Sequence, residues 1–166
     1  MDDLQQKEEL RQKFIAVRLG ISDEEVISKS QLIADKLEIS VNWPDIKNVH
    51  IYRSVPEWKE VDTKIIEDKI KSCAPSSKIV YASIEKNQPL PQEQFDLIII
   101  PVLGFDKQCY RLGLGGGWYD RFLVHQRDAL KIGLAWQDCF VPEGLPHETH
   151  DIVLDKIITE TGIIDR

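Results

Sequence analysis

Residues 96–123 read DLIIIPVLGFDKQCYRLGLGGGWYDRFL, and the fold of the chain follows from this segment more than from any other. Its apolar run, Leu97 to Ile100, predicts a strand buried on both faces of a parallel sheet, and Pro101 is expected to end the ladder pairing. Four glycines lie within residues 113–117, and a helical pattern starts at Trp118. A strand, a glycine loop and a helix start in this order are typical of an anion site, because glycine lets backbone N–H groups approach a phosphate.

The glycine loop matches neither of the common nucleotide motifs. A Walker loop needs Gly-Lys followed by Ser or Thr, and a dinucleotide fingerprint starting at Gly113 needs a glycine where Trp118 stands. A turn that serves only close packing therefore remains an alternative. Arg111 and Asp120, on either side of the glycines, favour a phosphate site. Arginine can bind phosphate oxygens bidentately, and an aspartate can hold the Mg²⁺ that accompanies a nucleoside triphosphate.

Composition narrows the class of protein. A chain of 166 residues suits one domain, residues 1–166, and a formal net charge of -7 argues against a general binder of nucleic acid or membrane surfaces. A bound polyphosphate must therefore meet a local cluster of Lys and Arg. No apolar run approaches the roughly 20 residues of a membrane-spanning helix, and MDDLQQKEEL is too charged for a signal peptide. We expect a cytoplasmic monomer.

Cysteine and histidine spacing does not favour a zinc site. Cys73, Cys109 and Cys139 are widely spaced and form no C-x-x-C pair, which predicts free thiols rather than a disulfide framework. The stretch HETH at residues 147–150 is one residue shorter than the H-E-x-x-H of metalloproteases, and Pro146 places it in a loop.

Helical and strand patterns alternate along the chain. Helices are expected at residues 7–19, with Leu10, Phe14, Val17 and Ile21 on one face; from a capping box at Ser22 and Glu25 to Leu37; after an N-cap at Asp62 or Thr63; and from Trp118, with Phe122 and His125 on its face. Strands are expected around residues 49–51, 78–84, 97–100, 130–136, 152–154 and 157–159. This βαβ alternation predicts a three-layer, Rossmann-like α/β fold with a mostly parallel sheet and helices on both faces.

Two blocks of the opening segment together resemble the signature of the 5-formyltetrahydrofolate cyclo-ligase (5,10-methenyltetrahydrofolate synthetase) family. The family pattern is roughly P-G-x-[AG]-F-D followed by R-L-G-x-G-[GK]-G-[YF]-Y-D-R, and the chain departs from it slightly at Val102 and Trp118. Three weaker matches flank these blocks: KEELR at Lys7 to Arg11, EVDT at Glu60 to Thr63, and LPHETHDIVLDKIITE at Leu145 to Glu160. The resemblance implies the α/β fold of sugar-phosphate isomerase-like proteins.

The resemblance also implies a reaction: cyclisation of 5-formyltetrahydrofolate to 5,10-methenyltetrahydrofolate, dependent on ATP and Mg²⁺, with release of ADP and phosphate. It implies ATP binding by Lys7, Arg11, Arg111, Leu112, Gly113, Leu114, Gly115, Gly116, Gly117, Trp118 and Tyr119. It implies substrate binding by Val55, Glu60 and Trp118, metal binding by Asp120 and Asp151, and catalysis by Lys7, Arg111 and Asp120. Small molecules are the expected partners, with no nucleic acid and no membrane.

Three features leave the interpretation open. Arg18 shares the basic stripe of Lys7 and Arg11 but matches no family residue, so we expect it on a solvated face. Trp58 is either a packing plug or a face for an aromatic ligand. Relatives usually carry a longer insertion between Ile84 and Phe95, so this shortened chain should enclose the folate less fully. A nucleotide-binding regulatory protein without catalysis, and an ATP-dependent enzyme for a smaller substrate, are therefore alternative functions.

Overall fold

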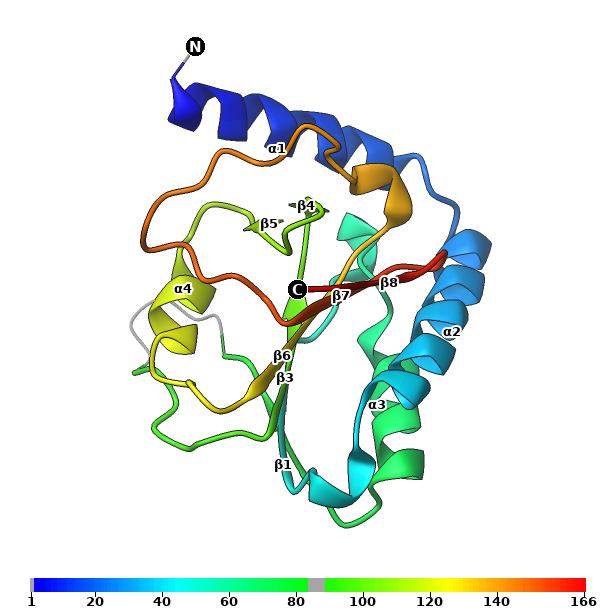
Figure 1. Cartoon of the computed structure of the whole chain (residues 1–166). Helices are drawn as coiled ribbons and strands as arrows, with labels where there is room; N and C mark the ends of the chain where they lie inside the picture. Colours follow the sequence, from blue (N-terminus) through cyan, green and yellow to red (C-terminus); the bar gives the residue numbers. More distant parts are fainter. Residues whose placement is uncertain (1, 84–88) are drawn as a thin grey trace.

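The protein is described here from a computed structural model, which places residues 2–83 and 89–166 (Figure 1). The helices are α1 (Asp3–Leu19), α2 (Asp23–Ser40), α3 (Thr63–Cys73) and α4 (Trp118–Leu123), with short 3-10 turns η1 (Trp43–Asp45), η2 (Pro56–Trp58) and η3 (Gln137–Cys139). The strands are β1 (Asn48–Ile51), β2 (Lys78–Tyr81), β3 (Leu97–Pro101), β4 (Gly104–Phe105), β5 (Arg111–Leu112), β6 (Leu130–Leu134), β7 (Lys156–Ile158) and β8 (Ile163–Asp165).

The main sheet has the strand order β2-β1-β3-β6-β7-β8, in which all neighbours are parallel except β7 and β8. Figure 1 shows α2 and α3 on one face of this sheet and α4 on the other. Leu97 and Ile99 of β3 pack in the core on the α2 and α3 side, whereas Ile98 and Ile100 pack on the α4 side. The predicted three-layer α/β fold is confirmed, and the unbroken apolar run of β3 follows from burial on both faces.

Local sequence signals set the starts of two helices. Ser22 accepts a hydrogen bond from the Glu25 N–H at 3.2 Å, and Glu25 accepts one from the Ser22 N–H at 2.9 Å, so the predicted capping box begins α2. Asp62 caps α3 by accepting a hydrogen bond from the Lys64 N–H at 2.9 Å. Ile33 and Leu37 of α2 are fully buried, as their spacing predicts.

The chain departs from the expected elements in several places. Pro101 still pairs with Leu134, so β3 runs one residue further than predicted, because a proline at a strand end costs only its own N–H. Residues 152–154 are irregular, and the strand lies at Lys156–Ile158. β8 and the β4–β5 hairpin were not predicted. α4 ends at Leu123, which leaves His125 outside it.

The expected second strand reaches only Tyr81, and residues 84–88, at the start of the shortened segment, lie outside the described residues. All three cysteines are free, as their spacing predicts. Among the described residues, no helix is long and apolar enough to cross a membrane.

Helix α1 lies across the carboxyl ends of the parallel strands (Figure 1). It is held there by Phe14, which is only 1% exposed and packs on the backbone of β4. A Cβ atom on Gly104 would lie 2.5 Å from a ring carbon of Phe14, closer than two carbon atoms can approach. The glycine therefore sets how closely α1 docks on the domain, and with it the position of every side chain that α1 sends to this end of the sheet.

We expect Gly104→Ala to destabilise the protein by about 1–3 kcal/mol, the usual cost of forcing an extra carbon into a packed core. Urea denaturation followed by circular dichroism measures the change. Gly162→Ala is the matched control, because a Cβ there meets nothing within 4 Å and its backbone is not left-handed. Equal stability of the two variants would show that α1 adjusts freely and that the close contact with Phe14 does not fix it.

Candidate active site

Three segments that are far apart in sequence meet at the carboxyl end of the sheet. They are the first half of α1, the glycine loop at residues 113–117, and the loop before β7 (Figure 1). Arg11 Nε donates to the carbonyl of Gly113 at 3.0 Å, and Lys7 Nζ donates to Asp151 Oδ2 at 2.9 Å. Ligands of open α/β sheets bind at this end, outside the strands. The structure therefore brings together the segments that carry Lys7, Arg11 and Asp151, and ATP binding by them stays a prediction.

The glycine loop presents N–H groups without protein acceptors. Gly115 has φ +93° and Gly117 has φ +63°, conformations that favour glycine, so the loop turns sharply between β5 and α4. Arg121 Nη1 donates to the carbonyl of Gly116 at 3.1 Å, as Arg11 does to that of Gly113, so two guanidinium groups hold loop carbonyls. Among the described residues, no N–H group from residue 113 to residue 117 donates a hydrogen bond to the protein. Such a loop can accept an anion.

Two carboxylates, Asp120 and Asp151, lie on pieces of chain that hydrogen bonds join. Asp120 in α4 pairs with Arg111 at 2.7 Å, and Arg111 also donates to the carbonyl of Ile152 at 2.7 Å. Asp120 in turn accepts a hydrogen bond from the Ile152 N–H at 3.3 Å. These bonds hold the residue after Asp151 against Asp120, so the two predicted metal ligands come from adjacent pieces of backbone. Arg111, whose side chain is only 6% exposed, thus links Asp120 to the carbonyl of the residue after Asp151, and its contact with ATP stays a prediction.

Asp151 is held as a carboxylate. Burial alone would raise its pKa, but the N–H of Glu148 and the ammonium of Lys7 outweigh burial and hold the pKa below its usual value. Within the described part of the chain, no three His, Cys, Asp or Glu side chains form a group that could hold a metal ion by themselves. Two carboxylates fit Mg²⁺ only if other oxygens complete its coordination, which is how this ion usually binds next to substrate phosphates.

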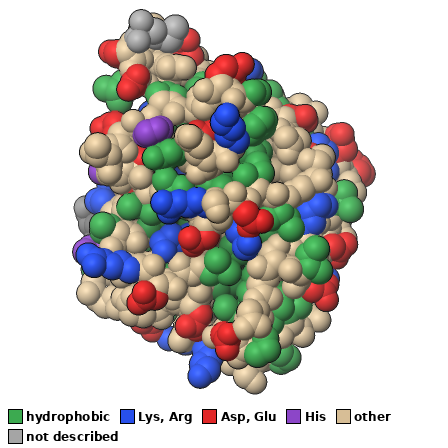
Figure 2. Space-filling model, viewed as in Figure 1, with side chains coloured by type: hydrophobic (Ala, Val, Ile, Leu, Met, Phe, Trp, Pro, Cys, Tyr) green, Lys and Arg blue, Asp and Glu red, His purple; other side chains and the backbone are tan. Residues whose placement is uncertain are grey.

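The surface charge agrees with a local site rather than a broad basic face. On the face shown in Figure 2, Lys and Arg side chains alternate with Asp and Glu. Such mixing suits a protein with a net charge of -7. A single cluster of cations around one loop is what binding of a small polyphosphate requires.

Two of the predicted substrate residues, Val55 and Glu60, lie on the loop after β1, and the third, Trp118, begins α4. Glu60 accepts a hydrogen bond from the N–H of Val55 at 2.8 Å and has a side chain only 8% exposed. Trp118 stacks on His50, with ring centroids 5.8 Å apart. Trp58 is 46% exposed, which argues against a packing plug, and its contact with an aromatic ligand stays a prediction.

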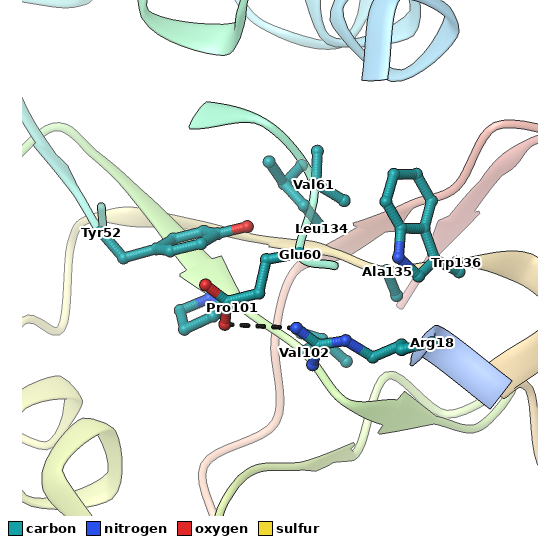
Figure 3. Close-up of a pocket in the computed structure, with 9 residues that line it drawn as sticks. All are labelled: Arg18, Tyr52, Glu60, Val61, Pro101, Val102, Leu134, Ala135 and Trp136. Carbon is teal, nitrogen blue, oxygen red and sulfur yellow. Dashed lines mark ion pairs between the residues drawn. The ribbon is translucent and has the colours of Figure 1, made fainter. Parts of the chain in front are cut away.

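The prediction for Arg18 is wrong. Its side chain is 7% exposed and forms an ion pair with Glu60 at 3.4 Å (Figure 3). The helical spacing explains the error, because Arg18 follows Phe14 by four residues and therefore lies on the same buried face of α1. The misleading signal was that Arg18 continues the basic stripe of Lys7 and Arg11, which suggested a solvated face.

His50 is a second residue that the sequence did not single out. It lies on β1 under α4, fully buried among Phe95, Trp118 and Phe122, and burial lowers its pKa to about 4. The ring is therefore neutral at pH 7. Its place among aromatic rings gives it a packing role beneath Trp118.

Comparison with known proteins decides the family. Residues 74–160 match the model of the 5-formyltetrahydrofolate cyclo-ligase family. A 5-formyltetrahydrofolate cyclo-ligase from Mycoplasma pneumoniae is 30% identical over 164 residues, covering 93% of this chain and 98% of the relative. The chain belongs to this family. A solved 5,10-methenyltetrahydrofolate synthetase from the same organism superposes with a TM-score of 0.79 at 28% identity, covering 93% of this chain and 98% of that one. The Aquifex aeolicus protein of that name gives a TM-score of 0.76 at 27% identity, covering 96% and 92%.

The comparison also bears on the shortened segment. Because 164 aligned residues include 98% of the Mycoplasma pneumoniae cyclo-ligase, that protein is about as short as this one. A cyclo-ligase therefore needs no longer chain. The expectation of a less enclosed folate stays a prediction, since residues 84–88 lie outside the described part.

Proposed function

We propose that the protein is an ATP- and Mg²⁺-dependent 5-formyltetrahydrofolate cyclo-ligase, which forms 5,10-methenyltetrahydrofolate and releases ADP and phosphate. Membership of the family supports the reaction. The observation that carries the ATP dependence is the glycine loop, whose described N–H groups have no protein acceptor and whose Gly113 carbonyl accepts a hydrogen bond from Arg11, one helical turn after Lys7.

The phosphates are assigned to the loop and to the cations around it. Backbone N–H groups of residues 113–117 would bind phosphate oxygens directly. Lys7 uses one of its three N–H donors on Asp151, which leaves two for a phosphate. Arg11 holds the loop through the Gly113 carbonyl and places its guanidinium beside Gly115, where a Cβ atom would lie 3.4 Å from it. Leu112, Leu114, Trp118 and Tyr119 complete the proposed nucleotide contacts.

The metal is assigned to Asp120 and Asp151, with phosphate oxygens and water as its other ligands. Bound there, Mg²⁺ would neutralise charge on the β- and γ-phosphates. Arg111 would keep Asp120 in place, because it binds both that carboxylate and the carbonyl next to Asp151.

The reaction explains why such a site is needed. A formamide oxygen is a poor leaving group, so it first attacks the γ-phosphorus and ADP departs. The neighbouring folate nitrogen then attacks the activated carbon, loses its proton, and phosphate leaves with the former formyl oxygen. The residues of the chain have mainly to position both substrates and neutralise the phosphates. Glu60, Val55 and Trp118 would hold the folate next to the γ-phosphate.

One assay tests the proposal. The protein is incubated with Mg²⁺, ATP and 5-formyltetrahydrofolate, and the ultraviolet absorbance of methenyltetrahydrofolate is followed together with ADP release. We expect both products in equal amounts. ATP binding without either product would favour a nucleotide-binding regulatory protein. ADP release that depends on another small carbonyl compound would favour an ATP-dependent enzyme for a smaller substrate.

Gly116→Ala should raise the KM for ATP about tenfold or more while leaving stability unchanged. A Cβ at Gly116 meets nothing within 4 Å and the backbone there is not left-handed, so the fold tolerates it. The same carbon would occupy space that a phosphate needs next to the loop, and one charge-assisted hydrogen bond is worth about 1.5–3 kcal/mol. Steady-state kinetics and urea denaturation measure the two quantities. Gly162→Ala again serves as the control, and an unchanged KM in Gly116→Ala would place the phosphates elsewhere.

A further inference from the structure

A buried ion pair joins α1 to the loop after β1. Figure 3 shows Arg18 and Glu60 pointing toward one another from these two segments. The atoms Arg18 Nη2 and Glu60 Oε1 lie 3.4 Å apart, and the two side chains are 7% and 8% exposed. Replacing such a pair by well-packed apolar residues is often neutral or stabilising, so stability alone gives little reason to keep it.

Arg18 also fixes the backbone around Glu60. Its Nε donates to the carbonyl of Trp58 at 3.0 Å, while Glu60 accepts from the N–H of Val55 at 2.8 Å. The guanidinium of Arg18 thus contacts both Trp58 and Glu60, and Glu60 in turn binds Val55 at the start of the same loop. Lys59, within it, has the left-handed value φ +50°, and its carbonyl accepts a hydrogen bond from Trp136 Nε1 at 2.8 Å. Arg18 and Trp136 together hold this loop against the ends of the strands.

A small cavity lies at the same place. Its volume is about 10 Å³, room for about one water, and Arg18 and Glu60 line it together with residues at or just after the ends of β1, β3 and β6. In the described part of the chain, Arg18 Nη2 is buried and makes no hydrogen bond. Beyond its ion pair with Glu60, this nitrogen therefore has hydrogen-bonding capacity left at the carboxyl end of the sheet, where ligands of this fold class bind.

We propose that Arg18 is a positioning residue for the folate: it holds Glu60 ionised and correctly placed, and it fixes the residue 55–60 loop that carries Val55, Glu60 and Trp58. The inference rests on the proposed function, in which Glu60 contacts the folate. An ionised Glu60 would accept hydrogen bonds from N–H donors of the pterin ring, which a protonated and displaced side chain would do poorly. Arg18 itself touches Glu60 and the loop.

The electrostatics agree with this geometry. Burial raises the pKa of Glu60, and the N–H of Val55 and the charge of Arg18 oppose that rise. The other titratable groups nearby are Tyr52 after β1, Tyr119 of α4 and Cys139 of η3, all with pKa values raised by burial and therefore uncharged at pH 7. Among the described residues, Arg18 is thus the cation next to Glu60, and its charge favours the ionised carboxylate.

Two Arg18 variants test the proposal, with the reaction assayed on the intact chain. Arg18→Met removes the charge and keeps the length of the side chain, whereas Arg18→Lys keeps the charge and loses the planar fork. We expect Arg18→Met to raise the KM for 5-formyltetrahydrofolate about tenfold or more, with the KM for ATP within about twofold of wild type. Losing the cation raises the Glu60 pKa further, so the acid limb of kcat/KM for the folate should move to higher pH. Arg18→Lys should raise the folate KM but keep the acid limb near its wild-type position.

The control is a second ion pair with a buried glutamate, one that involves neither α1 nor the residue 55–60 loop. Lys29 lies 3.1 Å from Glu160, whose side chain is 8% exposed, so Lys29→Met also leaves a buried glutamate without its cation. It should lower stability without moving the folate KM or the acid limb.

Each outcome decides the matter. Unchanged folate KM and acid limb in Arg18→Met, or equal rises in both KM values, would overturn the role of Arg18 while leaving the proposed function intact. Should Arg18→Met fail to fold, Arg18→Lys decides alone: a wild-type folate KM overturns the proposal. Absence of turnover in the wild-type chain would instead contradict the proposed function, and with it this inference.

Discussion

Replacing Asp120 or Asp151 by asparagine is expected to lower turnover about a hundredfold or more. Removing a residue that merely orients a metal ligand typically costs ten- to a hundredfold, so losing a carboxylate that binds the ion directly should cost at least as much. The amide keeps the size of the side chain but loses the negative charge that Mg²⁺ requires. The measurement is kcat at saturating ATP and folate, with Mg²⁺ varied from limiting to excess.

The two substitutions should differ in their effect on stability. Asp120 neutralises the buried Arg111, and breaking a buried pair usually costs about 3–5 kcal/mol. Because Asp120 is 27% exposed and an amide can still accept a hydrogen bond, we expect Asp120→Asn to lose clearly less than that. Asp151→Asn should lower the free energy of unfolding by less than Asp120→Asn does, since its partner Lys7 retains more access to water, with 13% of its side chain exposed.

Asp128→Asn is the matched control, because this carboxylate is exposed and forms no ion pair among the described residues. It should change neither turnover nor stability. A residue whose asparagine variant turns over at the wild-type rate under limiting Mg²⁺ is not a metal ligand, whatever its effect on unfolding.

The central segment was predictable because its signals are local. Leu97 to Ile100 is apolar at every position since helices cover both faces of the sheet, and the glycines at 115 and 117 adopt the left-handed conformations for which glycine is needed. The proximity of Lys7 to Asp151 also followed the family resemblance, although these residues lie at opposite ends of the chain. For the apolar strand and the glycines, the residue type itself states the local requirement, which is burial in one case and a left-handed backbone in the other.

The features that the sequence did not predict depend mostly on contacts between residues far apart in the chain. The burial of Arg18 is acceptable only because Glu60 lies opposite it, and no local spacing reveals that meeting. The β4–β5 hairpin has two residues in each strand, too few for an alternating pattern. β7 lies beyond the apolar stretch at 152–154, which instead supplies backbone groups to Arg111 and Asp120. At residues 152–154 the side chains of Arg111 and Asp120 bind the backbone of Ile152, and an apolar pattern alone does not reveal such partners.

The error at Arg18 changes how the basic residues of α1 should be compared. Lys7→Ala and Arg11→Ala are each expected to weaken ATP binding about ten- to a hundredfold, the effect of losing one charge-assisted contact worth about 1.5–3 kcal/mol. Lys7 has donors left for phosphate beyond its bond to Asp151, and Arg11 holds the carbonyl of Gly113. Calorimetric titration with ATP and Mg²⁺ measures both losses.

Arg18 cannot serve as the neutral control on this helix, because removing it would leave Glu60 buried without its cation. Lys13 can, since it is exposed on α1, lies over the Phe14 ring at 5.6 Å, and makes no hydrogen bond or ion pair with the glycine loop among the described residues. Lys13→Ala removes the same unit of charge from the same helix, so it reports the general attraction of α1 for a polyanion. If it weakened ATP binding as much as Lys7→Ala, the phosphates would be sensing the net charge of the helix, and the specific contacts assigned to Lys7 and Arg11 would be wrong. If only the latter two variants lose affinity, and raising the salt concentration does not equalise all three, direct contact remains as the explanation.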